Sequence, residues 1–526
     1  AAHASVADVS GHVPVVLIVF DEFPINSLLT KDNTIDTVRY PNFAKLAAGS
    51  NWYRNATSVN GATVRAVPAI LTGQLPKRKL LPDFAGHPRN IFTLLGRRYK
   101  LDAFETVTHL CPAELCKGDN QLPSFWSRMS SLYDDTSVLY EHLIAPAEIE
   151  ENLPSVTTDW GNFETDAEAN TRNHGSVTDS RVRTYERFVR SIAPEAGPTL
   201  NMVHIEMPHA VWQYLPSGHV YGASATALTV PGKTGDAWPP SVPATDEAWQ
   251  RHLLQTGYTD SLLGQALARM KQQDVYDKSL LIVTADHGIS FRAGSARRVL
   301  SKTSGKDLVF VPLFVKLPGQ TTGKIIDKHV QTIDILPTIA NVLGINIPWH
   351  VDGHSVLSDY VSDAFTFNFQ RFSDATMLHG RSRTLNEMQG LFGTRPGWDG
   401  VYAAGPAPQL FGRPVSSLAI DDDAPGTADI DDGTKQLLHD LPRDSDLIPD
   451  PIGGYIDGDV DDGAMVAVAV NGRIGGVSRT FDVGHGLQYS VMVPEQLMHA
   501  GANDVRVYVV DQQGSAYTLH NLPLAS

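Results

Sequence analysis

An uncharged run of five residues, Leu281 to Ala285, is followed at once by Asp286, His287 and Gly288. Short aliphatic and β-branched runs are typical of a strand buried on both faces, as in a parallel sheet. Ligands of open α/β sheets collect at the carboxyl ends of the strands, which is where Asp286 and His287 fall. The stretch therefore predicts a chemically active strand end. The alternative is a turn whose Asp caps a loop and whose His has no role.

A second apolar run, Val15 to Phe20, ends in Asp21 and Glu22, so the first strand of the chain also delivers carboxylates at its carboxyl end. If the two strands are neighbours in one parallel sheet, Asp21 meets Asp286 and His287. Adjacent carboxylates repel each other, and a divalent cation relieves that repulsion. The two strand ends together predict a metal site.

The segments between these strands alternate in character. An amphipathic helix with apolar residues from Leu254 to Met270 leads into the 281–285 strand. Further predicted elements are a helix over 41–47, strands over 201–207 and 309–315, and a helix over 330–343 ended by Gly344. Helix-then-strand order is typical of an α/β fold with a central, mostly parallel sheet flanked by helices.

Two further strand or helix ends carry polar groups. Thr63 lies where a helix ending at Gly73 would begin, although Pro68 suggests a later start. The free N–H groups of a helix start suit an anion such as phosphate, while the alternative is that Thr63 is only an N-cap. His209 follows the 201–207 strand, and its alternative role is that of a surface loop histidine.

The cysteine content is two residues, Cys111 and Cys116. No further Cys or His lies nearby at a spacing typical of zinc sites. We expect a small-loop disulfide and hence an oxidising, extracytoplasmic compartment, with two free thiols as the alternative.

The character of the chain changes after about residue 360. Acidic runs at 421–423 and 429–432 in Pro- and Gly-containing sequence predict a solvated linker over 376–450, after a catalytic domain of residues 1–375. Residues 451–526 then alternate as strands, with Asn471 and Gly472 giving a strong hairpin signal. We expect a β-sandwich accessory domain there.

Charge and length exclude several classes of protein. The chain has 526 residues and a net charge of −16, which argues against a nucleic-acid partner. No apolar run approaches the roughly 20 residues that span a bilayer. The chain opens on Ala1 without an initiator Met, so we expect a mature or excised piece whose possible membrane anchor lies outside it.

Taken together, these segments resemble the alkaline phosphatase superfamily, in its sulfatase-like and phosphoglycerol or phosphoethanolamine transferase branch, over about residues 13–360. In that family an N-terminal strand ends in an acidic metal ligand, matched by Asp21. The nucleophile lies ten residues before the Gly of a Leu-Thr-Gly sequence, and counting back from Gly73 gives Thr63. The Asp-His-Gly after a late strand supplies two further metal ligands, matched by Asp286 and His287.

Departures from the family pattern narrow the chemistry. Sulfatases carry a Cys or Ser, in a Cys-x-Pro-Ser-Arg pattern, that becomes formylglycine. Here Thr63 holds that position and Val67 replaces the Arg. A threonine cannot form the aldehyde, so sulfatase activity is disfavoured. Two-metal members carry Asp-x-x-x-His before the Asp-His-Gly strand, but Asp260 is followed at that spacing by Gly264. The resemblance therefore implies a single divalent cation, manganese or zinc.

The resemblance also implies roles for other side chains. Thr63 would join the metal ligands and attack a phosphodiester. His209 resembles the substrate-pocket His of the transferases and would protonate the leaving alcohol or bind phosphate. Arg65 would neutralise a phosphate oxygen or lie on the surface. The weaker ligand candidates are Glu22, His329 and His354.

The resemblance thus implies a metal-dependent phosphotransferase of the cell envelope. It would move a phosphoglycerol-like group from a phospholipid donor to a glycan acceptor, as the soluble ectodomain of a membrane-anchored protein. One alternative is a phosphodiesterase that hydrolyses the same bonds. Another is a catalytically silent envelope protein whose β-sandwich binds glycan.

Overall fold

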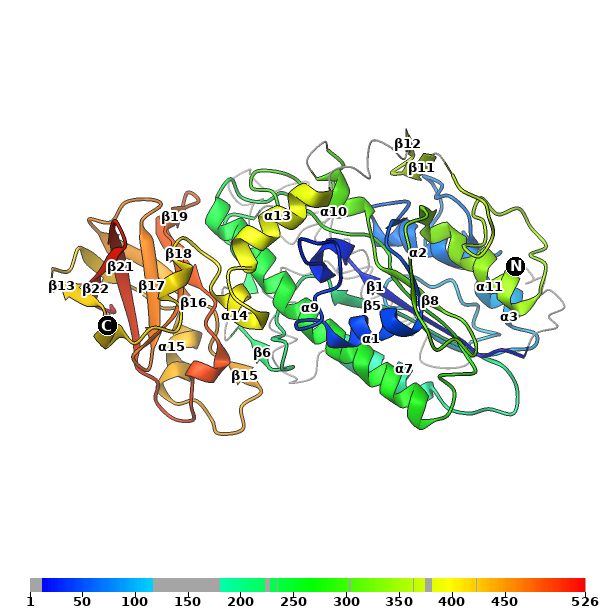
Figure 1. Cartoon of the computed structure of the whole chain (residues 1–526), viewed down its shortest axis with the longest axis horizontal. Helices are drawn as coiled ribbons and strands as arrows, with labels where there is room; N and C mark the ends of the chain where they lie inside the picture. The colour runs from blue at the N-terminus through cyan, green and yellow to red at the C-terminus, as the bar shows by residue number, and fades with distance from the viewer. Residues whose placement is uncertain are drawn as a thin grey trace, which may run out of the picture.

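A seven-stranded sheet forms the centre of the larger part of the molecule (Figure 1). The computed structural model describes residues 12–116, 180–222, 228–233, 235–301, 304–362, 364–373, 381–421 and 423–525. The strand order is β4-β5-β1-β7-β8-β2-β9, with bounds β1 Val15–Asp21, β2 Asn51–Tyr53, β4 Lys100–Phe104, β5 Thr199–Pro208, β7 Leu280–Ala285, β8 Leu313–Lys316 and β9 Lys324–Ile326. Strands β4, β5, β1 and β7 are parallel, while β8 runs antiparallel to both β7 and β2. The expected mostly parallel α/β sheet is confirmed.

Helices cover both faces of this sheet because β1 is apolar on both sides. Val16, Ile18 and Phe20 pack into the core under α1 (Pro41–Gly49), α7 (Ser180–Ser191) and α9 (Val242–Gln272). Val15, Leu17 and Val19 pack into the opposite core, under α2 (Thr63–Thr72), α3 (Ile91–Leu95) and α11 (Ile335–Leu343). The result is a three-layer α/β/α arrangement, with α2 above the face that Asp21 shares.

The observed ends of the helices and strands agree in part with those predicted from the sequence. Helix α2 begins at Thr63 and ends before Gly73, whose φ of 68° is the left-handed conformation that glycine adopts easily. Pro68 lies inside that helix rather than near its start. The predicted 309–315 strand begins only at β8, after the short helix α10 (Gly305–Val309). The 330–343 segment is helical only from 335, after β10 (Val330–Gln331) and a 3-10 turn over 332–334.

The C-terminal part consists of two sheets packed face to face (Figure 1). One has the order β13-β22-β21-β17-β18 and the other β14-β16-β20-β19. Their bounds are β13 Ala419–Asp421, β14 Gly426–Ala428, β16 Ile452–Gly458, β17 Met465–Val470, β18 Arg473–Arg479, β19 Phe481–Asp482, β20 Leu487–Val491, β21 Val505–Gln513 and β22 Ala516–Leu522. Asn471 and Gly472 both have positive φ and connect β17 to β18, as the hairpin signal predicts.

The stretch expected to be a linker is folded where the structure describes it. It forms α13 (Arg381–Phe392), α14 (Gly397–Tyr402), β15 (Leu447–Ile448) and α15 (Asp432–His439). Strands β13 and β14 in this stretch pair with β22 and β16 of the C-terminal sheets. The linker expectation is therefore wrong for these segments, because their backbone groups are used in sheet pairing. Residues 376–380, Asp422 and Ala1 lie outside the described residues, and the domain boundaries at 375 and 450 stay a prediction.

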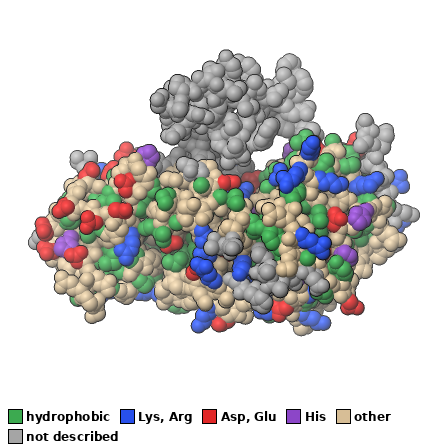
Figure 2. Space-filling model, turned by 90° about the horizontal axis from the view of Figure 1, so that it is seen from above, with side chains coloured by type: hydrophobic (Ala, Val, Ile, Leu, Met, Phe, Trp, Pro, Cys, Tyr) green, Lys and Arg blue, Asp and Glu red, His purple; other side chains and the backbone are tan. Residues whose placement is uncertain are grey.

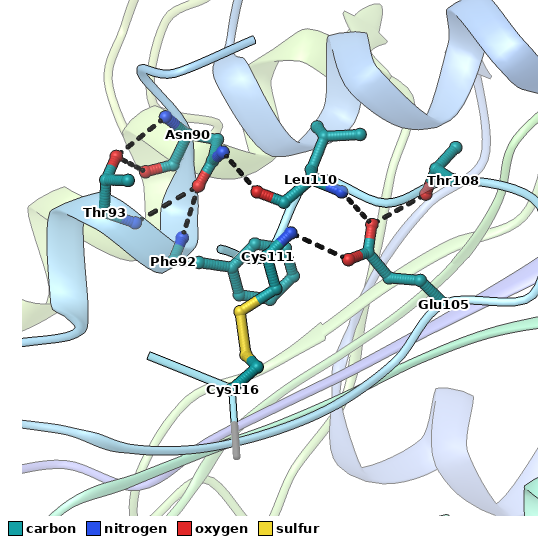
Figure 3. Close-up of a disulfide and its surroundings, with 8 residues drawn as sticks. All are labelled: Asn90, Phe92, Thr93, Glu105, Thr108, Leu110, Cys111 and Cys116. Atoms are coloured by element: carbon teal, nitrogen blue, oxygen red, sulfur yellow. Dashed lines mark hydrogen bonds between the residues drawn. A yellow bond between two sulfur atoms is a disulfide. The ribbon is translucent and has the colours of Figure 1, made fainter. Parts of the chain in front are cut away.

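The two cysteines form the expected disulfide, Cys111–Cys116 (Figure 3). The buried Glu105 beside it accepts hydrogen bonds from the backbone N–H groups of Leu110 and Cys111 and from the Thr108 hydroxyl. Asn90 caps α3 and also donates to the Leu110 carbonyl. These contacts hold the loop against α3. Among the described helices, none is long and apolar enough to cross a bilayer.

Candidate active site

Three neighbouring parallel strands, β5, β1 and β7, bring polar side chains together on one face of the sheet, toward the carboxyl ends of the strands. Asp21 is the last residue of β1, and Asp286 directly follows β7, which pairs with β1. His204 lies on the other neighbour, β5, opposite Val19. Because side chains alternate along a strand, these three residues share the sheet face covered by α2. The strand-end argument thus places Asp21 and Asp286 side by side.

Asp21, His204 and Asp286 are the strongest candidates for metal ligands. Each offers one ligand atom, and these atoms lie within 4.8 Å of one another, all buried. His204 Nε2 is 3.7 Å from Asp21 Oδ2. Within the described part of the chain, the buried His204 Nε2 and Asp286 Oδ2 have no hydrogen-bond partner. Oxygen and imidazole ligands with unused lone pairs fit a divalent cation such as manganese or zinc.

The pKa values of these two carboxyl groups also favour a cation site. Burial and the neighbouring Asp286 raise the pKa of Asp21 well above its usual range. Burial also raises the pKa of Asp286 to about 7, against hydrogen bonds from the backbone N–H groups of Glu22 and His287. Two buried carboxylates next to each other are unfavourable as anions, and the nearby Arg298 offsets this only in part. A cation between them would remove that cost.

His287 presents a lone pair to the same cluster. Its Nδ1 lies 2.9 Å from the Gly288 carbonyl, which accepts, so the proton sits on Nδ1 and Nε2 is unprotonated. That Nε2 is 3.5 Å from Asp286 Oδ2 and 3.8 Å from Asp21 Oδ1. Burial and nearby Arg298 lower the pKa of His287 to about 3, which keeps the ring neutral. His287 is therefore also able to bind a cation.

Thr63 points its hydroxyl into this cluster. It is the first residue of α2, the N-cap is Ala62, and the cap makes no side-chain hydrogen bond. Thr63 Oγ1 lies 3.4 Å from both carboxylate oxygens of Asp21 and 3.3 Å from His287 Nε2. The hydroxyl donates to one of these acceptors at a time. Thr63 is therefore not the N-cap of α2, and its hydroxyl lies beside the candidate ligands Asp21 and His287.

The loop before Thr63 is held by a hairpin from much later in the chain. Asn368 lies at the tip between β11 (Ala364–Phe367) and β12 (Gln370–Ser373), and its side chain accepts from the Gly61 N–H. The Asn368 N–H in turn donates to the Val59 carbonyl. On the other side of the loop, the Ser58 hydroxyl donates to the Asp286 carbonyl. The position of Thr63 is therefore set by elements distant in sequence.

Glu22 faces away from the carboxylate pair, toward arginine. It is fully buried, with a φ of 55° that is uncommon for a residue with a side chain. Its carboxylate accepts from Arg298 Nε at 2.7 Å, with Arg297 at 3.8 Å. Burial alone would raise the pKa of Glu22, but Arg298 and Arg297 outweigh it and hold the pKa well below its usual range. Glu22 is therefore ionised and forms an ion pair with Arg298.

His209 lies beside this ion pair. Its Nε2 is 3.7 Å from Glu22 Oε2 and accepts a hydrogen bond from Arg298, while its Nδ1 donates to the Ala210 carbonyl. Burial and Arg298 lower the pKa of His209, although Glu22 opposes them. Both ring nitrogens are engaged, so protonating a leaving alcohol would first require release of Arg298. In this arrangement His209 positions the arginine.

The remaining candidates lie in other surroundings. Arg65 lies over the Phe369 ring, 5.6 Å from its centroid. His329 contacts Thr57 Oγ1 at 3.0 Å and the Phe365 ring. His354 stacks on Tyr360, with ring centroids 3.7 Å apart. These contacts do not bring the three side chains to the Asp21 cluster.

Asp260 has a structural role. It accepts hydrogen bonds from the backbone N–H groups of Asn42 and Phe43 at the start of α1. Gly264, where two-metal relatives carry a His, has no room for a side chain, because a Cβ there would lie 2.8 Å from the Asn42 side chain. The helix face that would supply a second metal site is used to pack α9 on α1.

Residues 14–345 match the family model described as Sulfatase. Arylsulfatase K of Homo sapiens is 30% identical over 99 residues, which are 19% of this chain and 18% of that protein. Lipoteichoic acid synthase 2 of Bacillus subtilis is 29% identical over 135 residues, covering 24% of this chain and 20% of that protein. The aligned segments thus span about a fifth of these relatives.

One solved structure with a detectable likeness is the phosphonate monoester hydrolase SpPMH from Silicibacter pomeroyi. It has a TM-score of 0.41 and 19% identity, and the match covers 67% of this chain and 78% of that chain.

Proposed function

The chain belongs to the sulfatase family, and we propose that within it the protein is a metal-dependent phosphotransferase of the cell envelope with Thr63 as nucleophile. The observation that carries this proposal is the Thr63 hydroxyl, which lies 3.4 Å from Asp21 and 3.3 Å from His287. A threonine side chain carries a methyl group on the alcohol carbon, so its oxidation cannot give the aldehyde of a sulfatase. The hydroxyl itself must then be the reacting group.

The ligand set proposed for the cation is Asp21 and Asp286 with His287 and His204. A divalent cation bound there would lower the pKa of an adjacent hydroxyl and neutralise charge on a phosphoryl oxygen. His204 adds to the ligands inferred from the sequence, since its unused Nε2 faces Asp21.

The proposed reaction begins with attack by Thr63 Oγ1 on the phosphorus of a phosphodiester. Its hydroxyl proton leaves to water, because the lone pairs of Asp21 and His287 next to it are those proposed to hold the cation. The oxygen–phosphorus bond to Thr63 forms as the bond to the leaving alcohol breaks, and that alcohol takes up a proton. An acceptor hydroxyl then attacks the same phosphorus, which makes the new diester and restores Thr63.

Arg298 is the group best placed to bind the substrate anion. Its Nε and one Nη are used by Glu22 and His209, which fixes the guanidinium plane. The side chain is 19% exposed, so the other Nη can donate to a phosphate oxygen. Because Glu22 already balances one arginine charge, the site suits a singly charged diester.

The donor and acceptor are proposed as a phospholipid and an envelope glycan. The aligned segment of lipoteichoic acid synthase 2 supports this choice over an arylsulfate substrate, since Thr63 disfavours sulfatase chemistry. The disulfide Cys111–Cys116 supports an extracytoplasmic location.

The proposal is tested with a chromogenic phosphodiester and metal-stripped protein, restored with manganese or zinc. We expect metal-dependent turnover that Thr63→Ala abolishes and Thr63→Ser retains in part, since serine keeps the hydroxyl. Adding an acceptor alcohol should divert product from water if the enzyme is a transferase. Turnover that survives in Thr63→Ala would contradict the nucleophile assignment.

A further inference from the structure

The loop after α2 exposes basic and apolar side chains together. Lys77, Arg78 and Lys79 are exposed and are followed by Leu80 and Leu81, which are 38% and 67% exposed. None of the three basic residues forms an ion pair with a described residue. An exposed leucine pair beside three cations that form no ion pair with a described residue is uncommon on a protein surface, because exposed leucines gain nothing from packing.

The positive charge of this loop contrasts with the net negative charge of the whole chain. Residues 65–100 contain eight Lys and Arg and one Asp, whereas the whole chain has a net charge of −16. Figure 2 shows basic side chains next to hydrophobic ones toward the right end of the visible face, while acidic side chains gather toward the left end. The positive potential is therefore local.

The loop lies on the same rim of the molecule as Thr63. Arg78 and Arg65 both lie over the Phe369 ring, at 4.5 and 5.6 Å from its centroid. Phe369 follows Asn368, which holds the loop before Thr63. Lys77 and Leu80 also share a shallow hollow with Val64 and Arg65. The basic side chains thus border the residue after the proposed nucleophile.

Two more exposed apolar side chains flank the site. Val64 follows Thr63 and is 40% exposed, and Val299 follows Arg298 and is 60% exposed. The two loops are in contact, because a Cβ on Gly61 would lie 3.3 Å from the Arg298 carbonyl oxygen. We call the set Val64, Arg65, Lys77, Arg78, Lys79, Leu80, Leu81 and Val299 the rim patch.

We propose that the rim patch docks the protein on an anionic phospholipid bilayer, with the Thr63 site facing the headgroups. Lys and Arg are attracted to anionic headgroups, and exposed Leu and Val insert at the interface between headgroup and acyl chain. A soluble polyanion would use the charges but would leave the four apolar side chains in water. The proposal rests on the proposed function only in taking a lipid as donor; docking itself needs no turnover.

Co-sedimentation of the full chain with vesicles tests this. We expect binding to phosphatidylglycerol vesicles, none to phosphatidylcholine vesicles, and a loss of binding between low and high salt. Changing Lys77, Arg78 and Lys79 to Gln should weaken binding about 100-fold, from roughly fivefold per charge. Leu80→Ser with Leu81→Ser should weaken it without changing the salt dependence.

A matched control removes three exposed basic residues elsewhere. The side chains of Arg190, Lys278 and Arg383 are 64–72% exposed. Each forms an exposed ion pair with an acidic residue four positions away in the sequence. Their change to Gln alters the net charge equally and should leave vesicle binding unchanged. Equal loss in the control, no binding to phosphatidylglycerol at low salt, or equally tight binding of soluble polyphosphate would overturn the proposal.

Failure of docking and failure of the proposed function give different results. Thr63→Ala should bind vesicles like the wild type, and the Lys77/Arg78/Lys79 variant should cleave the soluble chromogenic diester at the wild-type rate. Thr63-dependent turnover without vesicle binding would refute docking alone. Vesicle binding without Thr63-dependent turnover would refute the proposed function alone.

Discussion

Cation binding should displace a proton from the Asp21–Asp286 pair. Both carboxyl groups are buried, and the pKa of Asp286 is raised to about 7 while that of Asp21 is raised well above its usual range. Such a pair titrates as a unit. A carboxyl with a pKa near 7 is about 90% protonated at pH 6 and about 10% at pH 8. A bound cation requires both carboxylates ionised.

We therefore expect at least about one proton released per manganese at pH 6, because Asp286 alone contributes about 0.9, and a smaller contribution from Asp286 at pH 8. Titration calorimetry of metal-stripped protein in buffers of different ionisation enthalpy measures this number directly. Asp286→Asn should remove the part of the release that comes from Asp286 and make the remainder less dependent on pH between 6 and 8. Asp307→Asn is a control, because Asp307 is also buried with a raised pKa but hydrogen-bonds to Asn26 and Ser290. A binding enthalpy at pH 6 that is independent of buffer would refute the reasoning.

The same pKa fixes the sign of the pH dependence of stability. The folded pKa of Asp286 is about 7 and the unfolded one about 3.9, so the folded state holds a proton that the unfolded state has lost. For metal-stripped protein this contribution is complete below about pH 4 and is lost as the pH rises to 7. The loss amounts to roughly 4 kcal/mol over that window. Denaturant unfolding of wild type against Asp286→Asn isolates it, and parallel curves would contradict it.

Three other predictions follow from single contacts. His204→Ala should weaken manganese binding by more than about 100-fold, because a ligand is lost. The control His252→Ala removes a buried histidine that is hydrogen-bonded to a serine, and it should leave manganese binding unchanged. Titration of metal-stripped protein with manganese measures both affinities. Gly264→Ala should destabilise the fold by about 1–3 kcal/mol through crowding against α1, whereas Gly390→Ala in α13, with open space around it, should stabilise by about 0.5–1 kcal/mol in urea unfolding. Replacing both cysteines of the Cys111–Cys116 disulfide by serine should cost about 2 kcal/mol, and an unchanged urea midpoint would contradict this.

The strands and the acids at their ends could be predicted from the sequence because the signals are local. Val15–Phe20 and Leu281–Ala285 are apolar runs, and Asp21 and Asp286 interrupt them at once. The end of α2 at Gly73 was also predictable, whereas Pro68 suggested a helix start later than the observed Thr63. What brings Thr63 to Asp21 is the packing of α2 on the sheet, which no local pattern contains.

Several site residues were missed because their roles depend on distant contacts. His204 shares strand parity with Leu200 and Met202 but lies in the middle of β5, so only the register of β5 against β1, which puts it opposite Val19, shows that it belongs to the site. Arg297 and Arg298 lie in a loop with no spacing signal, and only the fold places them on Glu22. The acidic stretch predicted as linker is folded because its strands pair with β16 and β22, partners that its composition does not reveal.

The mass of the intact protein after incubation with phosphatidylglycerol and manganese tests the central claim most directly. The account predicts a phosphoglycerol adduct that maps to Thr63 in wild type and is absent from Thr63→Ala. An acceptor alcohol should discharge it. An adduct on another residue, or turnover of the lipid by Thr63→Ala, would contradict Thr63 as the nucleophile.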